Sequence, residues 1–149
     1  MTTTDADHVV VDTDVLLAAS DAGRATFGAA RTIFNDWPAD GTTLYTSGQI
    51  LREYLCVATR PVDRNGLGMS LADATANCRA FGARMRFLPE NDKVHSRLLE
   101  LIEDTACSGK QVHDANIAAT MLVHGVGTVV TSNVSDFKRF ERLIRVVGL

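Results

Sequence analysis

Short apolar runs alternate with longer amphipathic segments along this chain. The run HVVVD, residues 8–12, is continuous and rich in β-branched side chains, as is typical of a strand buried on both faces. Comparable runs predict further strands at residues 42–46, 86–89, 128–132 and 144–147.

Helical spacing of apolar residues predicts helices between these strands. Capping residues and breakers mark where the helices begin and end, with Pro38, Pro61 and Gly125 as the clearest stops. The predicted helices follow Asp12, run from Arg24 to Trp37, start at Ser47 and stop before Arg60, and cover residues 70–85, 92–107 and 112–125. Residues 61–69 hold several breakers and are expected to form an exposed loop.

This alternation predicts an α/β fold, a three-layer α/β/α sandwich around a parallel central sheet. We expect residues 1–7 to form a short N-terminal tail and residues 8–149 to form a single domain. In such sheets ligands bind beyond the carboxyl ends of the strands. Asp12 ends the first strand and Asp136 follows the fourth, so both are expected at that edge.

The amino-acid composition indicates which broad class of protein this is. A chain of 149 residues with 46% hydrophobic and 22% charged residues is typical of one globular domain. The first eight residues do not resemble a secretory signal, and no run approaches the ~18 apolar residues that a membrane span needs. Cys56, Cys78 and Cys107 are widely spaced and are expected to be reduced thiols in the core. We therefore expect a cytoplasmic protein with no membrane association.

The net charge of −3 is unlike the basic surface of most nucleic-acid-binding proteins. The net charge therefore argues against nucleic-acid binding, but two basic groups weaken that argument. Cations clustered beside an acidic site can still contact phosphates. They are Arg52, Arg60 and Arg64 in one segment, and Lys138, Arg139 and Arg142 in another.

Two carboxylates lie on or beside the apolar faces of predicted helices. Asp114 precedes Ile117, Ala118 and Met121 on one face, where a lone charge is unfavourable unless it is paired or bound to a metal. The alternative is that Asp114 only stabilises the positive end of its helix. Glu53 borders another apolar stripe, and it either leans toward the sheet edge or is a solvated helix residue or a partner of Arg52.

The remaining acids lie at strand ends, where a structural role is equally open. Asp12 or Asp14 can cap the helix that follows the first strand, and Asp136 can have a turn or cap role ahead of Phe137. Asn133 is an ordinary turn residue that can also supply an amide oxygen. Gathered within a few ångströms, such acids repel one another unless a divalent cation neutralises them, and Mg²⁺ or Mn²⁺ suits an oxygen-rich site.

Three segments together resemble the PIN-domain ribonucleases, particularly the VapC-type toxins of VapBC toxin–antitoxin systems. They are VVVDTDVLLAAS, QILREYLCVATRP and VHDANIAATMLVHGVGTVVTSNVSDF, and the resemblance covers Val9 to Phe140. Their order, their spacing and the apolar pattern around them all agree with that family.

The resemblance implies that Asp12, Glu53 and Asp114 bind a metal ion, Mg²⁺ or Mn²⁺, with Asp136 as the fourth acid. It further implies an activated water as nucleophile, RNA as substrate, cleavage that leaves a 5′-phosphate, and frequent dimerisation. A VapB-like antitoxin is the implied partner, with a tail that occupies the active-site groove.

The chain departs from the family pattern at two positions. Asn133 stands where many PIN domains have an acid, which leaves the identity of the fourth ligand open, and Asp14 stands where Asn or Ser is common. Asp14 is either an outer ligand or a helix cap. Thr13 and Thr131 have hydroxyls near the predicted site, where they either orient a ligand or water or serve the local structure.

Three further residues have open roles. His113 either contacts substrate or is a surface residue beside Asp114. Arg60 and Lys138 either bind phosphate or are solvated surface charges.

Two other functions remain open from the sequence. The segment Asp12-Thr13-Asp14 after an apolar strand also resembles the haloacid-dehalogenase phosphatases, in which the two acids serve as nucleophile and general acid. The later paired aspartates of that family are missing here. The third hypothesis is a catalytically weak module that binds an antitoxin or RNA.

Overall fold

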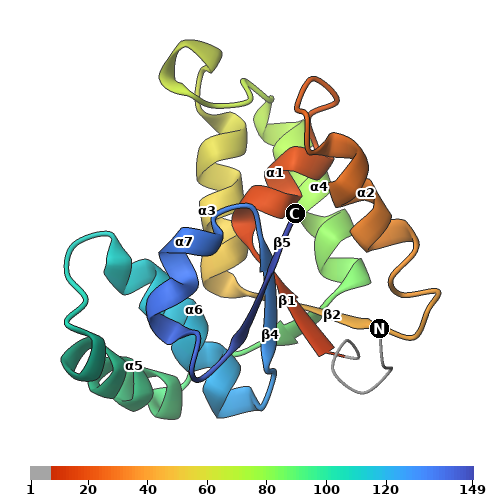
Figure 1. Ribbon diagram of the computed structural model, residues 1–149. Helices are drawn as coiled ribbons and strands as arrows, with labels where there is room; N and C mark the ends of the chain where they lie inside the picture. Colours follow the sequence, from red (N-terminus) through yellow and green to blue (C-terminus); the bar gives the residue numbers. More distant parts are fainter. Residues whose placement is uncertain (1–7) are drawn as a thin grey trace.

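Five parallel strands form one sheet in the order β3-β2-β1-β4-β5 (Figure 1). The computed structural model describes residues 8–149, and the predicted N-terminal tail, residues 1–7, lies outside the described residues. The strands are β1 (His8–Val11), β2 (Thr43–Ser47), β3 (Arg86–Leu88), β4 (Thr128–Thr131) and β5 (Arg145–Gly148). The predicted parallel α/β sheet is confirmed.

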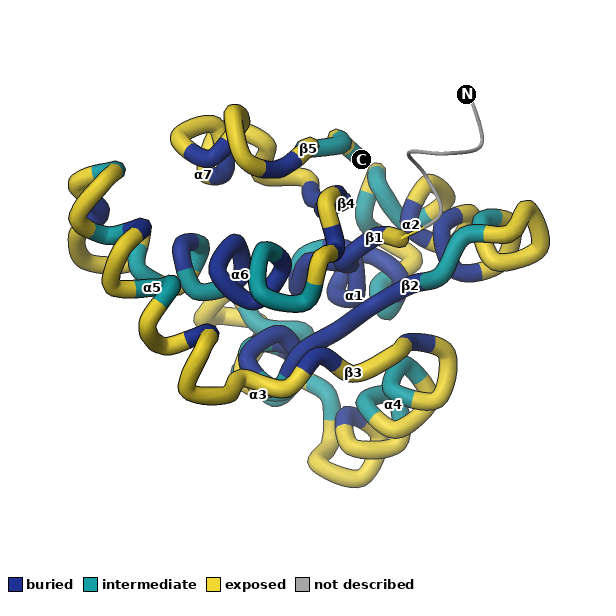
Figure 2. Tube along the Cα trace, turned by 90° about the horizontal axis from the view of Figure 1, so that it is seen from below, coloured by how far each residue is buried: buried dark blue, intermediate teal, exposed yellow. Residues whose placement is uncertain are grey.

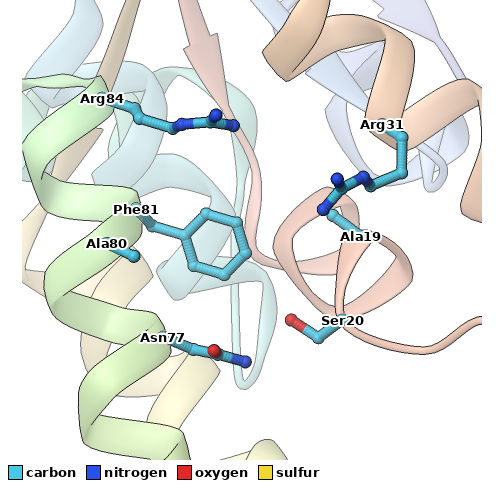
Figure 3. Close-up of a pocket in the computed structure, with 7 residues that line it drawn as sticks. All are labelled: Ala19, Ser20, Arg31, Asn77, Ala80, Phe81 and Arg84. Atoms are coloured by element: carbon cyan, nitrogen blue, oxygen red, sulfur yellow. The ribbon is translucent and has the colours of Figure 1, made fainter.

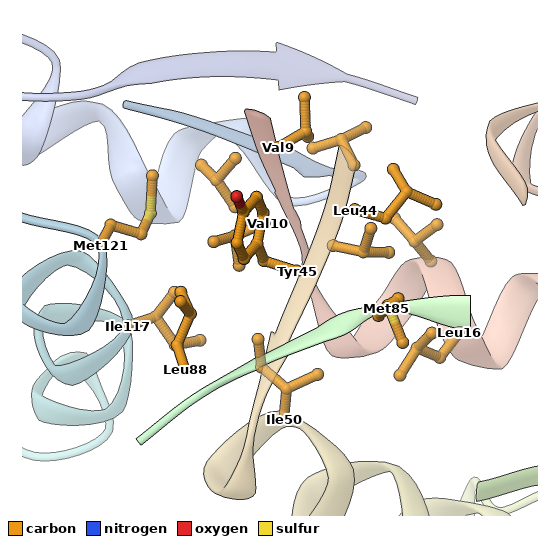
Figure 4. Packing of buried hydrophobic residues seen from close by; sticks show 14 of the residues in the cluster. Val9, Val10, Leu16, Leu44, Tyr45, Ile50, Met85, Leu88, Ile117 and Met121 are labelled. Atoms are coloured by element: carbon orange, nitrogen blue, oxygen red, sulfur yellow. The ribbon is translucent and has the colours of Figure 1, made fainter. Parts of the chain in front are cut away.

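Helices cover both faces of this sheet, with α1 and α6 on opposite sides (Figure 4). The α-helices are α1 (Thr13–Ala19), α2 (Phe27–Asn35), α3 (Gly48–Thr59), α4 (Leu71–Arg84), α5 (Asp92–Thr105), α6 (Gln111–His124) and α7 (Val134–Phe137). Two short 3-10 helices, η1 (Val62–Arg64) and η2 (Lys138–Phe140), complete the described elements. No helix within residues 8–149 has the length and apolar character needed to cross a membrane.

The core lies between the central strands and the helices on either side. Val9, Val10 and Val11 of β1 are at most 2% exposed, as expected for a strand covered on both faces. Figure 2 shows the buried core running along β1, β2 and α6, while α4 and α5 present exposed turns. Successive residues of β2 point to opposite faces: Tyr45 lies on the α6 side and Leu44 on the α1 side (Figure 4).

Two helical predictions needed correction. The second helix begins at Phe27 and not at Arg24, because the preceding residues form a turn in which Asp21 accepts a hydrogen bond from Gly23 N and pairs with Arg24 at 3.3 Å. No helix was predicted after β4, but this segment forms the short helices α7 and η2. These short helices bury Phe137 and Phe140, which anchor them to the core.

The predicted loop at residues 61–69 is mostly exposed but folds back onto the end of α3. Leu67 N donates to Val57 O, and Gly68 N donates to Arg60 O at 2.9 Å. Gly66 lies against this helix end so closely that a Cβ atom would overlap the carbonyl of Arg60. The loop therefore requires glycine at position 66 for close approach and not for an unusual dihedral angle.

The cysteines are all free, but they do not share one environment. Cys107 is buried and Cys78 is half-buried, whereas Cys56 is exposed on α3. The prediction of core thiols is therefore wrong for Cys56, which lies on the outer side of its helix.

Candidate active site

The carboxyl end of β1 meets the carboxyl end of β4, because these strands are neighbours in the sheet. Asp12 N extends this pairing by donating to Val130 O at 3.0 Å. Across the same junction, the fully buried Thr131 donates its hydroxyl to Asp12 Oδ2 at 2.9 Å. The predicted residues Asp12 and Thr131 therefore lie in direct contact although they are far apart in sequence.

Asp12 is a buried carboxylate that also caps α1. Its Oδ1 accepts a hydrogen bond of 2.8 Å from Thr13 N, so the capping alternative is confirmed for this residue. Burial raises the pKa of Asp12 to about 7, and repulsion from Asp14 and Glu53 adds to that shift. The hydrogen bonds from Thr131 and Thr13 act in the opposite direction, because they stabilise the ionised form.

Glu53 is half-buried on α3 and is held by two hydrogen bonds. Thr13 Oγ1 donates to Glu53 Oε2 at 3.0 Å, and Gln49 Nε2 donates to Glu53 Oε1 at 2.9 Å. Arg52 lies near Glu90 instead, at 3.6 Å, so the alternative of an Arg52–Glu53 pair is wrong. Glu53 therefore leans toward α1 and the sheet edge.

Gln49 was not anticipated from the sequence. It is 5% exposed, and its amide nitrogen donates both to Glu53 Oε1 and to His113 O at the start of α6, each at 2.9 Å. Its amide oxygen accepts from Asn116 Nδ2 at 2.7 Å. The one signal in the sequence is a polar residue beside the apolar stripe of α3, one helical turn before Glu53.

Asp114 and Asp136 lie close enough at the other end of the cluster for their charges to interact. Asp114 is half-buried in the first turn of α6, and partial burial raises its pKa to about 6, with repulsion from Asp136 and Glu53 acting in the same direction. His113 and Arg139 lower the pKa of Asp114, because positive charge favours the carboxylate. Asp136 is exposed on α7.

Asp14 does not cap its helix, contrary to one of the alternatives, because Asp12 occupies that position. Its Oδ2 instead accepts four hydrogen bonds from the segment that follows β4. The donors are Thr131 Oγ1 at 3.2 Å, Ser132 N at 3.0 Å, Ser132 Oγ at 2.7 Å and Asn133 Nδ2 at 2.9 Å. Its Oδ1 is buried and has no hydrogen-bond partner within residues 8–149.

The structure thus brings the four predicted acids into one chain of neighbours from four separate elements. Glu53 raises the pKa of both Asp12 and Asp114, and therefore lies near both of them. Ion pairs in the described part of the chain involve other acids, namely Asp21, Glu90 and Glu100, so no Lys or Arg neutralises this cluster by direct pairing.

The oxygen donors of the cluster are those that Mg²⁺ and Mn²⁺ prefer. The buried Asp14 Oδ1 without a partner fits a cation more naturally than it fits an isolated protein, since buried polar atoms are nearly always satisfied. No group of three or more His, Cys, Asp or Glu side chains within residues 8–149 is placed to hold a metal ion by itself. An ion at this cluster would therefore be held by few carboxylates and would keep several waters.

The other predicted residues are dispersed around the acids. His113 is exposed, and its backbone oxygen is the acceptor from Gln49. Arg60 Nη2 lies 3.8 Å from Sγ of Cys56, a residue of α3. Lys138 lies on η2. Arg139, of the second basic group, donates to Gln111 Oε1 at 2.9 Å and lowers the pKa of Asp114.

A separate pocket of about 420 Å³ opens at the far end of α1. Figure 3 shows Arg31 of α2 and Arg84 of α4 on opposite sides of it, with Phe81 pointing into the space between them. Ala19, Ser20, Asn77 and Ala80 complete the lining. None of the residues predicted for the active site lines this pocket.

The chain belongs to the PIN-domain family: the family model "PIN domain" matches residues 9–143. No curated protein sequence matches the chain. A chain of the VapBC2 complex from Rickettsia felis, bound to a DNA fragment from the promoter, has a TM-score of 0.66 at 16% identity, over 95% of this chain and 98% of that one.

Two further solved structures have the same fold. VapC20 of Mycobacterium tuberculosis, a toxin that cleaves the sarcin-ricin loop, has a TM-score of 0.60 at 20% identity, over 81% of this chain and 86% of that one. A chain of DNA-bound VapBC from Salmonella typhimurium has a TM-score of 0.65 at 18% identity, over 95% and 97%. At these identities the likeness establishes the fold.

Proposed function

We propose that this protein is a metal-dependent endoribonuclease that acts as the toxin of a toxin–antitoxin pair. The observation that carries the proposal is the meeting of Asp12, Glu53, Asp114 and Asp136, from four separate elements, without a directly paired cation among the described residues. Membership of the PIN-domain family and the likeness to VapBC chains support the same function.

Each residue has a role that its contacts suggest. Asp12, Glu53 and Asp114 would hold Mg²⁺ or Mn²⁺, and Asp136 would add a fourth negative charge. When bound, the ion supplies a Lewis acid that activates water for attack on an RNA phosphodiester. Thr131 and Thr13 orient Asp12 and Glu53 through hydrogen bonds of 2.9 and 3.0 Å.

Arg139 offers a guanidinium beside Asp114, where it would contact a phosphate that approaches the acids. Lys138 and Arg60 are further phosphate contacts at the edge of the site. Because the net charge is −3, these local cations matter more for RNA binding than the overall charge does.

The test is cleavage of total RNA by the purified protein with Mg²⁺, with Mn²⁺ and with a chelator. We expect discrete fragments only when a metal is present, and none from Asp114→Asn. Asp104→Asn is the matched control, because Asp104 is an exposed acid on α5. Cleavage in the chelator, or undiminished cleavage by Asp114→Asn, would contradict the proposal.

The proposed partner is a VapB-like antitoxin, since two of the structural relatives are DNA-bound VapBC complexes. The pocket between α1, α2 and α4 suits part of such a partner. Arg31 and Arg84 form no ion pair among the described residues and flank the apolar Phe81, so an amphipathic segment with acidic side chains would fit there. Exchanging both arginines for glutamate should weaken antitoxin binding while leaving RNA cleavage unchanged.

A homodimer, in the cytoplasm, is the proposed state of the free toxin. Sedimentation of the purified protein at several concentrations tests the oligomeric state.

The phosphatase alternative loses support from the environment of Asp14. Its Oδ2 is engaged by four donors from the segment after β4 and its Oδ1 is buried, so neither oxygen is free to protonate a leaving group. The alternative of a module that binds without cleaving is tested by growth: arrest that persists in Asp114→Asn would favour the binder.

A further inference from the structure

Asp14 has two carboxylate oxygens with opposite surroundings. Oδ2 accepts from Thr131 Oγ1, from both the backbone and the hydroxyl of Ser132, and from Asn133 Nδ2, all within 3.2 Å. Oδ1 is buried without a hydrogen-bond partner in the described part of the chain. Four donors on one oxygen fix the side chain, so the orientation of the other oxygen is also fixed.

The Asp14 carboxylate lies at the same junction as Asp12, because both contact Thr131. The hydroxyl of Thr131 lies 2.9 Å from Asp12 Oδ2 and 3.2 Å from Asp14 Oδ2, so a single hydroxyl bridges the two carboxylates. No Lys or Arg among residues 8–149 forms an ion pair with either acid. Two adjacent carboxylates with one unsatisfied buried oxygen are unfavourable in the protein alone, and a bound cation removes that penalty.

The side chain of Asp136 lies in a different environment from that of Asp14. It is exposed on the four-residue helix α7, and its side chain has no hydrogen bond that would fix it within the described residues. Asn133, the other residue considered for a fourth ligand, has its amide nitrogen committed to Asp14. Of these three side chains, Asp14 is therefore the one with a fixed and unsatisfied carboxylate oxygen.

We infer that Asp14 Oδ1 shares the active-site cation with Asp12, and that Asp136 is not required to hold that ion. This inference rests on the proposed metal-dependent function and names the ligand that completes its site. Asp136 then acts by charge near the substrate, opposite Asp114.

Calorimetric titration with Mn²⁺ and thermal unfolding in metal-free buffer test the inference without any activity measurement. Asp14→Asn keeps an amide oxygen for the four donors and removes the charge. We expect its dissociation constant for Mn²⁺ to rise about tenfold or more, and its metal-free melting temperature to rise, because repulsion with Asp12 is gone. Asp136→Asn makes the same chemical change at the exposed acid, and we expect Mn²⁺ binding close to that of the unchanged protein.

Two outcomes would overturn the inference. In the first, Asp14→Asn leaves the affinity for Mn²⁺ unchanged and lowers the metal-free melting temperature. This is the result expected if Asp14 only stabilises the segment after β4 through hydrogen bonds. The other is a larger loss of affinity in Asp136→Asn than in Asp14→Asn. Asp12→Asn separates this failure from that of the proposed function: if neither the unchanged protein nor this variant shows site-specific Mn²⁺ binding, the metal-dependent function itself is wrong.

Discussion

Gln49 donates a hydrogen bond of 2.9 Å to Glu53 Oε1 from the same amide nitrogen that donates to His113 O at the start of α6. Glu53 is thereby tied to the helix that carries Asp114. Because Asn116 Nδ2 donates to the oxygen of the same amide, the orientation of Gln49 is determined from both ends. Gln49 is buried, so its hydrogen bonds to the half-buried Glu53 and Asn116 are difficult to replace with water.

Replacing Gln49 with methionine removes these hydrogen bonds while keeping an unbranched side chain of similar length. We expect the free energy of unfolding to fall by about 1–3 kcal/mol, because the acceptors at Glu53 and His113 lose a buried donor. RNA cleavage should fall more than stability alone explains, since Glu53 is no longer held toward Asp114. Urea unfolding and initial cleavage rates measure the two effects.

Leu51→Met on the same helix is the control for introducing methionine, because Leu51 is a partly buried apolar residue outside the network. It should leave both quantities nearly unchanged. Full cleavage activity in Gln49→Met, measured where the protein is folded, would show that the network does not position Glu53.

The raised pKa of Asp12, about 7, predicts how stability depends on pH in metal-free buffer. An unfolded Asp titrates near ~4, so between pH 4 and pH 7 the folded state binds the proton more tightly than the unfolded state does. The contribution of Asp12 to the free energy of unfolding is therefore most favourable at low pH and declines as pH rises through this window.

Asp12→Asn should remove this dependence. Its free energy of unfolding should exceed that of the unchanged protein at pH 8, by up to a few kcal/mol at roughly 1.4 kcal/mol per pKa unit, and the difference should shrink toward pH 4. Urea unfolding of both proteins across this range, with a chelator present, measures the difference. A difference that is constant with pH would mean that the pKa of Asp12 is not raised.

The affinity for a metal ion should depend on pH in the opposite sense to the stability, because the same carboxyl groups must be ionised to bind it. Asp12 and Asp114, with pKa values of about 7 and about 6, must lose their protons before they bind a cation. We expect the apparent affinity for Mn²⁺, measured by calorimetry, to increase from pH 5.5 to about 8 and then to level off. Proton release during the titration, detected by comparing two buffers, should be larger at the lower pH. Equal affinities at both ends of the range would contradict this prediction.

Replacing Gly66 with alanine tests the packing of the loop after α3, and the same replacement at Gly82, in α4, is its control. Gly66→Ala places a Cβ atom onto the carbonyl of Arg60, so the loop must shift and stability should fall by about 1–3 kcal/mol. Gly82 lies within α4 with open space where a Cβ atom would be added, so Gly82→Ala should stabilise the protein by about 0.5–1 kcal/mol. Thermal unfolding of both variants gives the signs, and a stabilising Gly66→Ala would contradict the close contact described here.

The sheet was predictable because its signals are local. β1 is a short, continuous apolar run, and this is the pattern expected of a strand that is buried on both faces. The end of α6 was equally clear, since Gly125 adopts the left-handed conformation, with φ 70°, that commonly terminates a helix. The start of α2 was not predictable to the residue, because Asp21 and Arg24 form a side-chain turn that competes with helix formation.

The sequence by itself determined the alternation of strands and helices, the position of Asp12 at the end of a buried strand, and the placement of Asp114 at the start of an apolar helix. These follow from periodicity and chain order, which act over a few residues. Only the tertiary structure decided that Asp14 binds the segment after β4 instead of capping α1, and that Gln49 links Glu53 to α6. Both relationships join residues more than sixty positions apart, and the strand order and helix packing that bring them together depend on the whole core at once.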